Sequence, residues 1–382
     1  MANTLGKLIA PIYQNLSVVS REFVGFIPGV TRDNGGFGRA ALGQTVTAFT
    51  VPQNGLVDIV PSNIPPNDGD QVLGSFDITM TKAKMYPIKW NGEETLALDN
   101  GGFGVDPILA QQFQQGFRTI VNAVEQDLAV IAAANASRAA GTPGIAPFGT
   151  AGDLSDFAIP AQILDENGAP ALPRTMVVNG GAMANLRGKQ SVLYKVNEAG
   201  TDETLRRGKV GEVTGFGIGY SPPIKPVVKG TGSGYVLSAA ATAGTKTLTL
   251  GTGTGTVKAG DVVTLAGDAN RYVVASGTTG PGTITLQSPG LRLDHGSGDA
   301  VTIANSFTPN VAFTQDALLL ATRAPALPKG GDMGEHQTVV DPFSGIAFDV
   351  ARYVGYRQVR YEIGLVWGTA APNPEHIALL MG

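Results

Sequence analysis

The sequence contains no cysteine in its 382 residues. This absence excludes disulfide bonds, thiolate metal ligands and a cysteine nucleophile. Charged residues are also few, at 15% of the chain, whereas hydrophobic residues make up 43%. The chain can therefore bury a large core but has little charge with which to cover its surface. We expect other protein to cover part of that surface.

Histidine is scarce as well, and the three histidines lie in different segments, at His295, His336 and His376. The sequence has no HExxH, CxxC, GxSxG or Walker motif. We therefore expect no catalytic residue, no cofactor and no metal site, and we predict that the chain is not an enzyme.

Two loops are weaker candidates for a binding site. The glycine-rich run Gly251–Thr256 joins two predicted strands, so a turn is favoured over a phosphate-binding loop, which needs a following helix. Asp294, His295 and Asp299 could together hold a hard cation at a loop tip. A solvated loop is favoured over that cation site.

Clustered positive charge and long hydrophobic runs are missing too. The net charge is -4, and no run of Lys and Arg supplies the concentrated cations that a dedicated nucleic-acid binder needs. No apolar run has membrane-spanning length, and the first residues, MANTLGKLIAPIYQN, lack the basic start and apolar stretch of a secretory signal. We expect a cytoplasmic product with no membrane partner.

Glycine and proline, by contrast, are abundant, with 52 and 24 residues. Both residues interrupt regular structure, so they favour turns, loops and extended arms over a compact helical bundle. A chain of 382 residues is also long enough to divide into two or three lobes.

The first segment predicts an amphipathic arm. Apolar residues recur at three- and four-residue spacing from Leu5 through Leu8 and Ile12 to Phe23, which is the pattern of one helical face. Pro11 is expected to break or kink the helix. The polar face has too few Lys and Arg for membrane binding, so we expect Leu8 and Ile12 to contact a protein partner.

The hexapeptide DNGGFG occurs twice, at Asp33–Gly38 and Asp99–Gly104. Asn-Gly-Gly permits positive φ, so each copy is interpreted as a turn or hinge, with chance recurrence of a good turn sequence as an equal alternative. The strand-like segment between the copies is polar along much of its length. It predicts a long hairpin that reaches outward and needs neighbours to cover it. The candidate hinge and contact residues here are Gly35, Gly36, Gly101, Gly102, Lys82 and Lys84.

The strongest helical signal begins at Asp106, which we place as the N-cap before Pro107. Apolar residues then recur every three or four positions from Leu109 to Ile131. We predict a helix that runs to about Ala140 and is roughly 50 Å long at 1.5 Å per residue. An ordinary core helix is the alternative, but such length beside so much strand and loop favours the spine of a flattened subunit.

The segments after this helix predict a mixed domain with an insertion. We expect a helix over 153–167 interrupted near Pro160, and then a strand at Arg174–Asn179, a helix at Ala182–Arg187 and a strand at Val213–Tyr220. From 229 to 306, short strands alternate with Gly-rich turns about every ten residues, which is typical of a small antiparallel β-barrel or sandwich. A mixed pattern resumes at Phe307, so this region is interpreted as a domain inserted into another domain.

Two long strands near the end carry the one basic and aromatic cluster. Arg352, Arg357 and Arg360 lie there among three tyrosines. Strand alternation places Arg357 and Tyr361 on one face, and Arg360 and Tyr356 on the other. We favour ion pairing between subunits or within the sheet over contact with nucleic acid.

In this order, the parts resemble the Johnson (Hong Kong 97-type) fold of tailed-bacteriophage major capsid proteins, an α+β fold. More narrowly, the chain is similar to coat proteins of the short-tailed Salmonella-phage branch, which carry an inserted β-barrel at the same place. The similar stretches are ANTLGKLIAPIYQNLSVVSREF, VGEVTGFGIGYSPPIKPVVKGTGSGY, GTVKAGDVVTLAG and NVAFTQDALLLATRAPALP. None of them is a fixed signature, and the resemblance rests on their order over essentially the whole chain.

The resemblance implies a division of the chain into named parts. These are the N-terminal arm (1–38), the extended β-hairpin loop (39–98), the spine helix with the start of the peripheral domain (99–152), the axial domain (153–228 and 307–339), the inserted β-barrel (229–306), the long strands of the peripheral domain (340–370) and the C-terminal strand (371–382).

The resemblance also implies a function. Members assemble as hexamers and pentamers into an icosahedral head, through a procapsid that forms on a scaffolding protein and expands when DNA is packaged. The implied partners are further copies of the chain, the scaffolding protein, the portal protein, packaged double-stranded DNA in non-specific contact and, in some members, a decoration protein. The implied location is the virion, after assembly in the host cytoplasm. The alternatives are a tail or baseplate protein, or an adhesin whose β-insertion binds carbohydrate.

Overall fold

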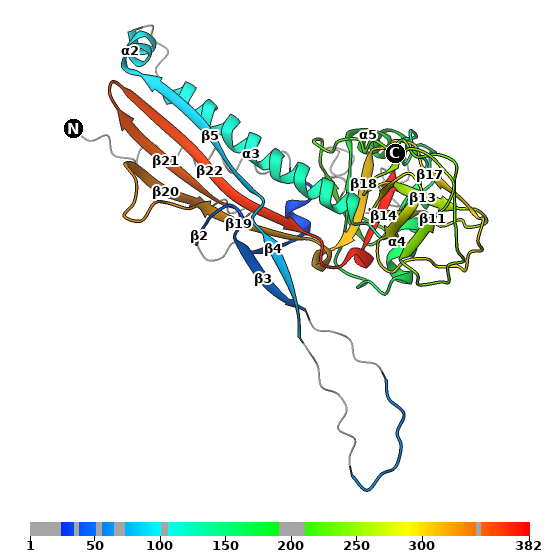
Figure 1. The fold of residues 1–382 in the computed structure, drawn as a ribbon. Coiled ribbons are helices and arrows are strands. Elements are labelled where there is room, and N and C mark those ends of the chain that lie inside the picture. The colour runs from blue at the N-terminus through cyan, green and yellow to red at the C-terminus, as the bar shows by residue number, and fades with distance from the viewer. Residues whose placement is uncertain are drawn as a thin grey trace.

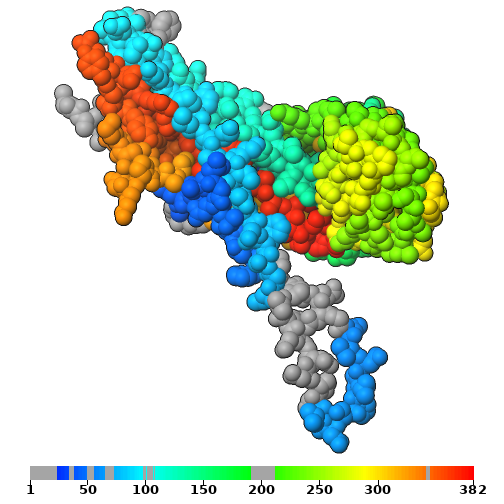
Figure 2. Space-filling model, in the orientation of Figure 1, coloured from blue at the N-terminus to red at the C-terminus, as the bar shows by residue number. Residues whose placement is uncertain are grey.

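The computed structural model describes residues 24–33, 38–50, 56–64, 73–100, 106–190, 211–340 and 345–382. The described chain is elongated, with a long sheet and helix at one end, a compact lobe at the other and a hairpin that projects between them (Figure 1). The space-filling view has the same three parts (Figure 2). Among the described helices, none combines the length and the hydropathy that crossing a membrane requires.

A seven-stranded sheet forms the long end. Its central strand, β22 (Gln358–Ala370), pairs along one edge with β5 (Lys82–Asn91). Along its other edge it pairs with β21 (Ala347–Gly355) and then with β19 (Leu319–Pro325). β20 (Gly334–Val340) extends the sheet beyond β21. Strands distant in the sequence therefore meet in one layer.

Short segments near the start of the described chain complete this sheet. β1 (Thr31–Asp33) and β2 (Arg39–Ala40) both pair in parallel with β19. The 3-10 helix η1 (Ile27–Gly29) precedes β1, and Phe26 and Ile27 are fully buried. The chain is therefore anchored in the core immediately before it reaches the sheet.

Helix α3 (Asp106–Ala134) lies along one face of this sheet (Figure 1). Its Phe113 meets Tyr361 edge-on with 5.5 Å between ring centroids, and its Phe117 meets Phe348 in the same way at 5.4 Å. Each large apolar side chain buried in this way contributes about 1.5–3 kcal/mol. The predicted apolar face of the helix is confirmed.

The predicted end of this helix near Ala140 is wrong. Asn135 ends the helix, where its backbone and side-chain nitrogens both donate to the carbonyl of Ile131. The following residues form β6 (Arg138–Gly141), which pairs in parallel with the last strand, β23 (Ile377–Met381). That pairing is a long-range contact, which helical periodicity cannot indicate.

The projecting hairpin consists of β3 (Thr45–Thr50) and β4 (Gly74–Thr79), which pair in antiparallel register. The expectation that the hairpin continues to residue 98 is wrong, because β5 joins the long sheet and is followed by helix α2 (Gly92–Asn100). On β5, Tyr86, Ile88 and Trp90 pack with the core beside α3, so this strand does have a face to bury.

The compact lobe continues from β6 and β23 with four further strands and two helices. β23 pairs with β18 (Pro309–Thr314), β18 with β7 (Arg174–Val178), β7 with β9 (Phe216–Tyr220) and β9 with β8 (Glu212–Val213). The helices are α4 (Ser155–Glu166) and α5 (Gly180–Lys189). Helix α4 is continuous through the buried Pro160, so the predicted interruption is wrong; one missing N–H in a short helix is tolerated here.

The expected grouping of 307–339 in one domain is also wrong. β18 belongs to the sheet of the lobe, but β19 and β20 belong to the long sheet. The chain passes from one to the other at the 3-10 helix η4 (Gln315–Ala317). A third 3-10 helix, η5 (Pro374–His376), lies where the chain returns into the lobe before β23.

The region 229–306 contains strands without helices, as predicted. They are β10 (Tyr235–Val236), β11 (Thr247–Leu250), β12 (Thr256–Val257), β13 (Val262–Leu265), β14 (Tyr272–Ser276), β15 (Thr278–Thr279), β16 (Gly282–Leu286) and β17 (Ala300–Ile303). They enclose a hydrophobic cluster whose members all lie between Tyr235 and Ile303. Where the chain enters and leaves the region, Val227 and Phe307 exchange two backbone hydrogen bonds.

Candidate assembly surfaces

The hairpin carries apolar side chains that no described residue covers. Beyond β3 and β4, the segment 56–64 lies outside regular secondary structure, and Ile59 is 98% exposed. Phe49 on β3 is 77% exposed. The exposed apolar side chains of the segment are Leu56, Val57, Ile59, Val60 and Ile64. Exposed apolar side chains gathered in one place mark a surface that binds protein.

Arg39 anchors the base of this hairpin to the long sheet. Its guanidinium donates two hydrogen bonds to the carboxylate of Asp349, at 3.0 and 3.2 Å, and a third to the carbonyl of Pro325 at 2.7 Å. The Asp349 side chain is only 5% exposed. A planar guanidinium satisfies such a buried carboxylate in a way that a lysine ammonium cannot.

We expect Arg39→Lys to lower the free energy of unfolding by about 1–2 kcal/mol, because one charge-assisted bond to Asp349 and the bond to Pro325 are lost. Urea denaturation of the unassembled subunit measures this change. The matched control is Arg32→Lys at an exposed position, which should leave the value unchanged. Equal effects of the two substitutions would contradict the anchoring role.

Asp349 is also part of a polar cluster on the sheet face opposite α3. The two ring nitrogens of His336 lie 3.0 Å from Asp349 and 2.9 Å from Asp332, and Tyr353 donates to Asp332 at 2.8 Å. The Tyr353 hydroxyl and the Gly334 N–H lower the pKa of Asp332 to about 2, and burial and Asp332 raise the pKa of Tyr353 to about 12. These residues line a cavity of about 300 Å³.

The arginine cluster near the sheet end divides into two kinds of contact. Arg352 pairs with Glu335 at 3.2 Å and Arg360 with Glu362 at 2.5 Å, both within the sheet. Arg357 has a φ of 53° and lies over the ring of Tyr356 at 5.4 Å. Because Tyr356 and Arg357 form the turn between β21 and β22, the strand alternation that we expected for them does not apply.

Of the two candidate lysines, Lys82 is bonded within the chain and Lys84 is exposed. Lys82 donates to Asp127 of α3 at 2.6 Å, and Trp367 donates to the other oxygen of Asp127 at 2.8 Å. Both lysines lie on β5 in the long sheet, and not in the hairpin where we expected them. The remaining candidates, Leu8, Ile12, Gly35, Gly36, Gly101 and Gly102, lie outside the described residues.

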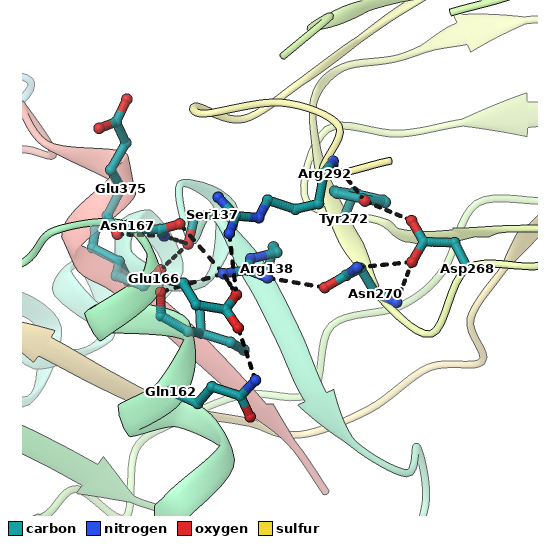
Figure 3. Close-up of polar contacts among 12 residues, drawn as sticks. Ser137, Arg138, Gln162, Glu166, Asn167, Asp268, Asn270, Tyr272, Arg292 and Glu375 are labelled. Atoms are coloured by element: carbon teal, nitrogen blue, oxygen red, sulfur yellow. Dashed lines mark hydrogen bonds and ion pairs between the residues drawn. The ribbon is translucent and has the colours of Figure 1, made fainter. Parts of the chain in front are cut away.

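The inserted region is joined to the lobe by a network centred on Arg138 (Figure 3). Arg138 is 3% exposed and pairs with Glu166 of α4 at 2.7 Å. It also donates to Asn270 of the inserted region at 2.9 Å. The Gln162 amide, together with Arg138, lowers the pKa of Glu166 despite its partial burial. Arg292, from the inserted region, lies 3.7 Å from the same carboxylate.

The predicted loop around Asp294 and His295 packs within the inserted region. His295 is buried between Asp268 and Asp299, at 3.4 and 3.2 Å. Tyr272 and Asn270 donate to Asp268, and these bonds outweigh its burial to lower its pKa. Asp294 accepts from the backbone of Ala243. These carboxylates are therefore hydrogen-bonded to other groups of the same chain. Among the described residues, no cluster of metal-ligating side chains occurs.

Glu125 joins three segments inside the core. It is fully buried on α3 and accepts hydrogen bonds from the backbone N–H groups of Phe26 and Ile27 and from the hydroxyl of Ser221, all at 3.0–3.1 Å. Burial raises the pKa of Glu125 to about 7, although these bonds oppose the rise. No lysine, arginine or histidine among the described residues forms an ion pair with it.

Sequence reasoning missed three charged residues that connect separate segments, Arg39, Glu125 and Arg138. A usable signal existed for two of them, because Glu125 follows Val124 of the apolar helical face and Arg138 lies within the alanine-rich segment Ala136–Ala140. A charge in such a setting is paired or hydrogen-bonded when it is buried. Its partner, however, is not evident from the sequence.

Comparisons with known proteins connect this architecture to phage structures. No protein-family model matches the sequence, and the search of curated proteins finds no match. Among solved structures, a chain of Mycobacterium phage Che8 is similar, with a TM-score of 0.51 and 13% identity over 94% of this chain and 91% of that chain. The two chains share a fold.

Two further solved structures have lower similarity. The capsid structure of the cyanophage P-SCSP1u gives a TM-score of 0.49 at 11% identity, over 92% of this chain and 86% of that chain. The virus-like particle from Pyrococcus furiosus gives 0.43 at 9% identity, over 98% and 99%. The likeness to the Che8 chain establishes a mixed α+β architecture, and the function has to be argued from the surfaces.

Proposed function

We propose that the chain is the major capsid protein of a tailed bacteriophage, which assembles as hexamers and pentamers into an icosahedral shell around the genome. The observation that carries this proposal is the projecting hairpin, whose apolar segment 56–64 has no partner among the described residues of its own chain. The fold shared with the Mycobacterium phage Che8 chain supports it. A surface of this kind is buried when copies of the subunit surround one another.

The elongated form suits a subunit that meets several neighbours. Contacts spread over arms and edges are individually modest, so each remains reversible, while a closed lattice adds many of them together. The partners that we propose besides further copies are a scaffolding protein, the portal protein, packaged DNA in non-specific contact and a decoration protein. The proposed location is the virion, after assembly through an expanding procapsid in the host cytoplasm.

We further propose that the region 229–306 is an inserted β-barrel of the kind carried by the short-tailed Salmonella-phage branch. Its separate hydrophobic cluster supports this proposal. So does the strand order, since β11 pairs with β16, β16 with β14, β14 with β13, β13 with β17 and β17 with β10. A bridge between Leu237 and Leu250 returns from the end of β10 to β11.

Expression of the full chain with its scaffolding protein tests the proposed function. We expect closed icosahedral particles in negative-stain and cryo-electron microscopy, with fivefold vertices among hexamers. Deletion of residues 51–72 should leave the subunit folded, because the described part of this loop, 56–64, contributes no residue to the four core clusters, and should abolish the particles. A chain that remains monomeric with its scaffold, or forms only tubes, would contradict the proposal.

A further inference from the structure

The ring of His336 lies between two carboxylates on the face of the long sheet opposite α3. Its Nδ1 is 3.0 Å from Asp349 of β21, and its Nε2 is 2.9 Å from Asp332. A neutral histidine ring carries one N–H and one lone pair, so it can donate to only one of two acceptors. Donation to both carboxylates requires a proton on each nitrogen. The two contacts together therefore require the charged ring.

The groups around this ring keep their charge across the neutral range of pH. The Tyr353 hydroxyl and the Gly334 N–H lower the pKa of Asp332 to about 2, and burial and Asp332 raise the pKa of Tyr353 to about 12. The other charged groups around the ring and the adjoining cavity are the ion pairs Arg39–Asp349 and Arg360–Glu362, and Lys84. Histidine is the side chain that ordinarily changes charge between pH 5 and 8, so the exchangeable proton of this cluster is that of His336.

The loop 326–333, between β19 and β20, forms one wall of that cavity through Leu327, Pro328 and Asp332. No residue of the loop belongs to the four core clusters. Of its side chains, Asp332 alone forms hydrogen bonds or ion pairs with described residues, namely Tyr353, Gly334 and His336. The loop is therefore held against the sheet by one side chain.

The loop side of the histidine contact can move, whereas the sheet side cannot. Gly330 and Gly331 have φ values of 105° and 86°, and a Cβ on either would meet no atom within 4 Å. Glycine changes between such conformations at little steric cost. Asp349, by contrast, is 5% exposed and is held within β21 by Arg39. When one of the two contacts breaks, Asp332 is the partner that leaves.

We infer that loop 326–333 is a lid that the proton of His336 holds shut. At low pH the charged ring bridges Asp332 and Asp349, and the lid closes one side of the cavity of about 300 Å³. When the ring loses its proton, it still donates to Asp349, but its lone pair faces the Asp332 carboxylate and repels it. The lid then opens, with Gly330 and Gly331 absorbing the change. The device acts within one copy and goes beyond the proposed function.

The other histidines differ from His336 in ways that make one of them a control. His376 has one carboxylate partner among the described residues, Asp316 at 2.8 Å. A neutral ring can maintain that single bond with its one N–H. His295 does lie between two carboxylates, but at 3.2 and 3.4 Å and inside the inserted region. Only His336 contacts the lid.

A spin label on the lid tests this inference, and the absence of cysteine allows a single label on the full-length, unassembled subunit. Met333→Cys places it beside Asp332, at a side chain that is 93% exposed. The mobile fraction in the electron paramagnetic resonance spectrum should rise roughly threefold or more between pH 5.5 and 8.5. In a His336→Gln background, the spectrum should be the same at both values. His376→Gln should keep the full response.

Asp332→Ala provides a second test, because it removes the tie without altering the sheet. Its label should be mobile at both pH values, and circular dichroism checks that each variant folds. Glu125 also titrates in this range, but it is present in every variant, so a response that it caused would persist in His336→Gln. A wild-type label equally mobile at both pH values would overturn the lid. So would a response that persists in His336→Gln, or one that His376→Gln also removes.

Discussion

Raising the pH from 5 to 9 should lower the free energy of unfolding by about 3 kcal/mol through Glu125 alone. The pKa of this carboxyl is about 7 in the folded chain, against 4.5 for an unperturbed glutamate. The folded state therefore holds the proton more tightly than the unfolded state. Its contribution to stability is fully present below pH 4.5 and is lost as the pH rises through 7, at about 1.4 kcal/mol for each pH unit between the two values.

The physical origin of this dependence is burial without a counter-ion. Phe26, Ile27 and Ser221 supply hydrogen bonds to the carboxylate, but no described cation neutralises it. Hydrogen bonds recover only part of the hydration free energy that a charge loses on burial. Deprotonation should therefore loosen the junction among α3, the segment that leads into η1 and the segment that leads to the inserted region.

Glu125→Gln is the variant that isolates this effect, because it keeps the shape and one acceptor but cannot ionise. Urea denaturation at pH 5, 6, 7, 8 and 9 should give a fall in stability for the wild type that exceeds the fall for the variant by about 3 kcal/mol. All other titratable groups are the same in the two proteins, so their contributions cancel in the difference. Parallel profiles for the two proteins would refute the role of Glu125.

The second large effect is expected at the junction between the inserted region and the lobe. Arg138→Met should lower the free energy of unfolding by about 2–3 kcal/mol, because the buried guanidinium loses its charge-assisted hydrogen bonds to Glu166 and Asn270. Glu166 would lose its 2.7 Å partner, and Asn270 would lose its donor from the lobe. The methionine retains most of the apolar volume of the arginine stem, so the effect reports the polar contacts.

Arg292→Met is the matched control for Arg138→Met. Arg292 approaches the same Glu166 carboxylate, but at 3.7 Å and with a side chain that is 38% exposed. Exposed ion pairs contribute less than about 1 kcal/mol, so this variant should lie close to the wild type in urea denaturation. Arg138→Met should also speed proteolytic cleavage near residues 229 and 306. Indistinguishable variants would mean that the insertion is held by packing alone.

Patterns among neighbouring residues correctly predicted the helices and strands that can be recognised without knowing which distant segment they pack against. The apolar stripe of α3 is a repeat within one helix, and the short strands of 229–306 are separated by Gly-rich turns, so both are visible in the sequence. β5 was assigned to the hairpin because it follows β4 directly. Its actual partner, β22, lies near the other end of the chain, and no local feature identifies it.

The same limit applies to the division of the chain and to the connecting residues. β18 and β19 are separated only by η4, yet they belong to different sheets. The residue patterns of the two strands are similar, and only their pairing with distant strands shows that they belong to different sheets. Arg138, likewise, was recognisable as a charge in an alanine-rich segment, but Glu166 and Asn270 could not be chosen as its partners from the many polar residues available.

The paired backbone bonds between Val227 and Phe307 bring the two ends of the inserted region side by side. The region 229–306 therefore leaves and rejoins the rest of the chain at one place, while the pairing of Tyr272 with Arg138 and the Arg138–Asn270 hydrogen bond hold it against the lobe. Adjacent ends allow an insertion to be exchanged with little change in the path of the chain on either side. The same position is a natural place to graft a foreign domain whose own termini are close together.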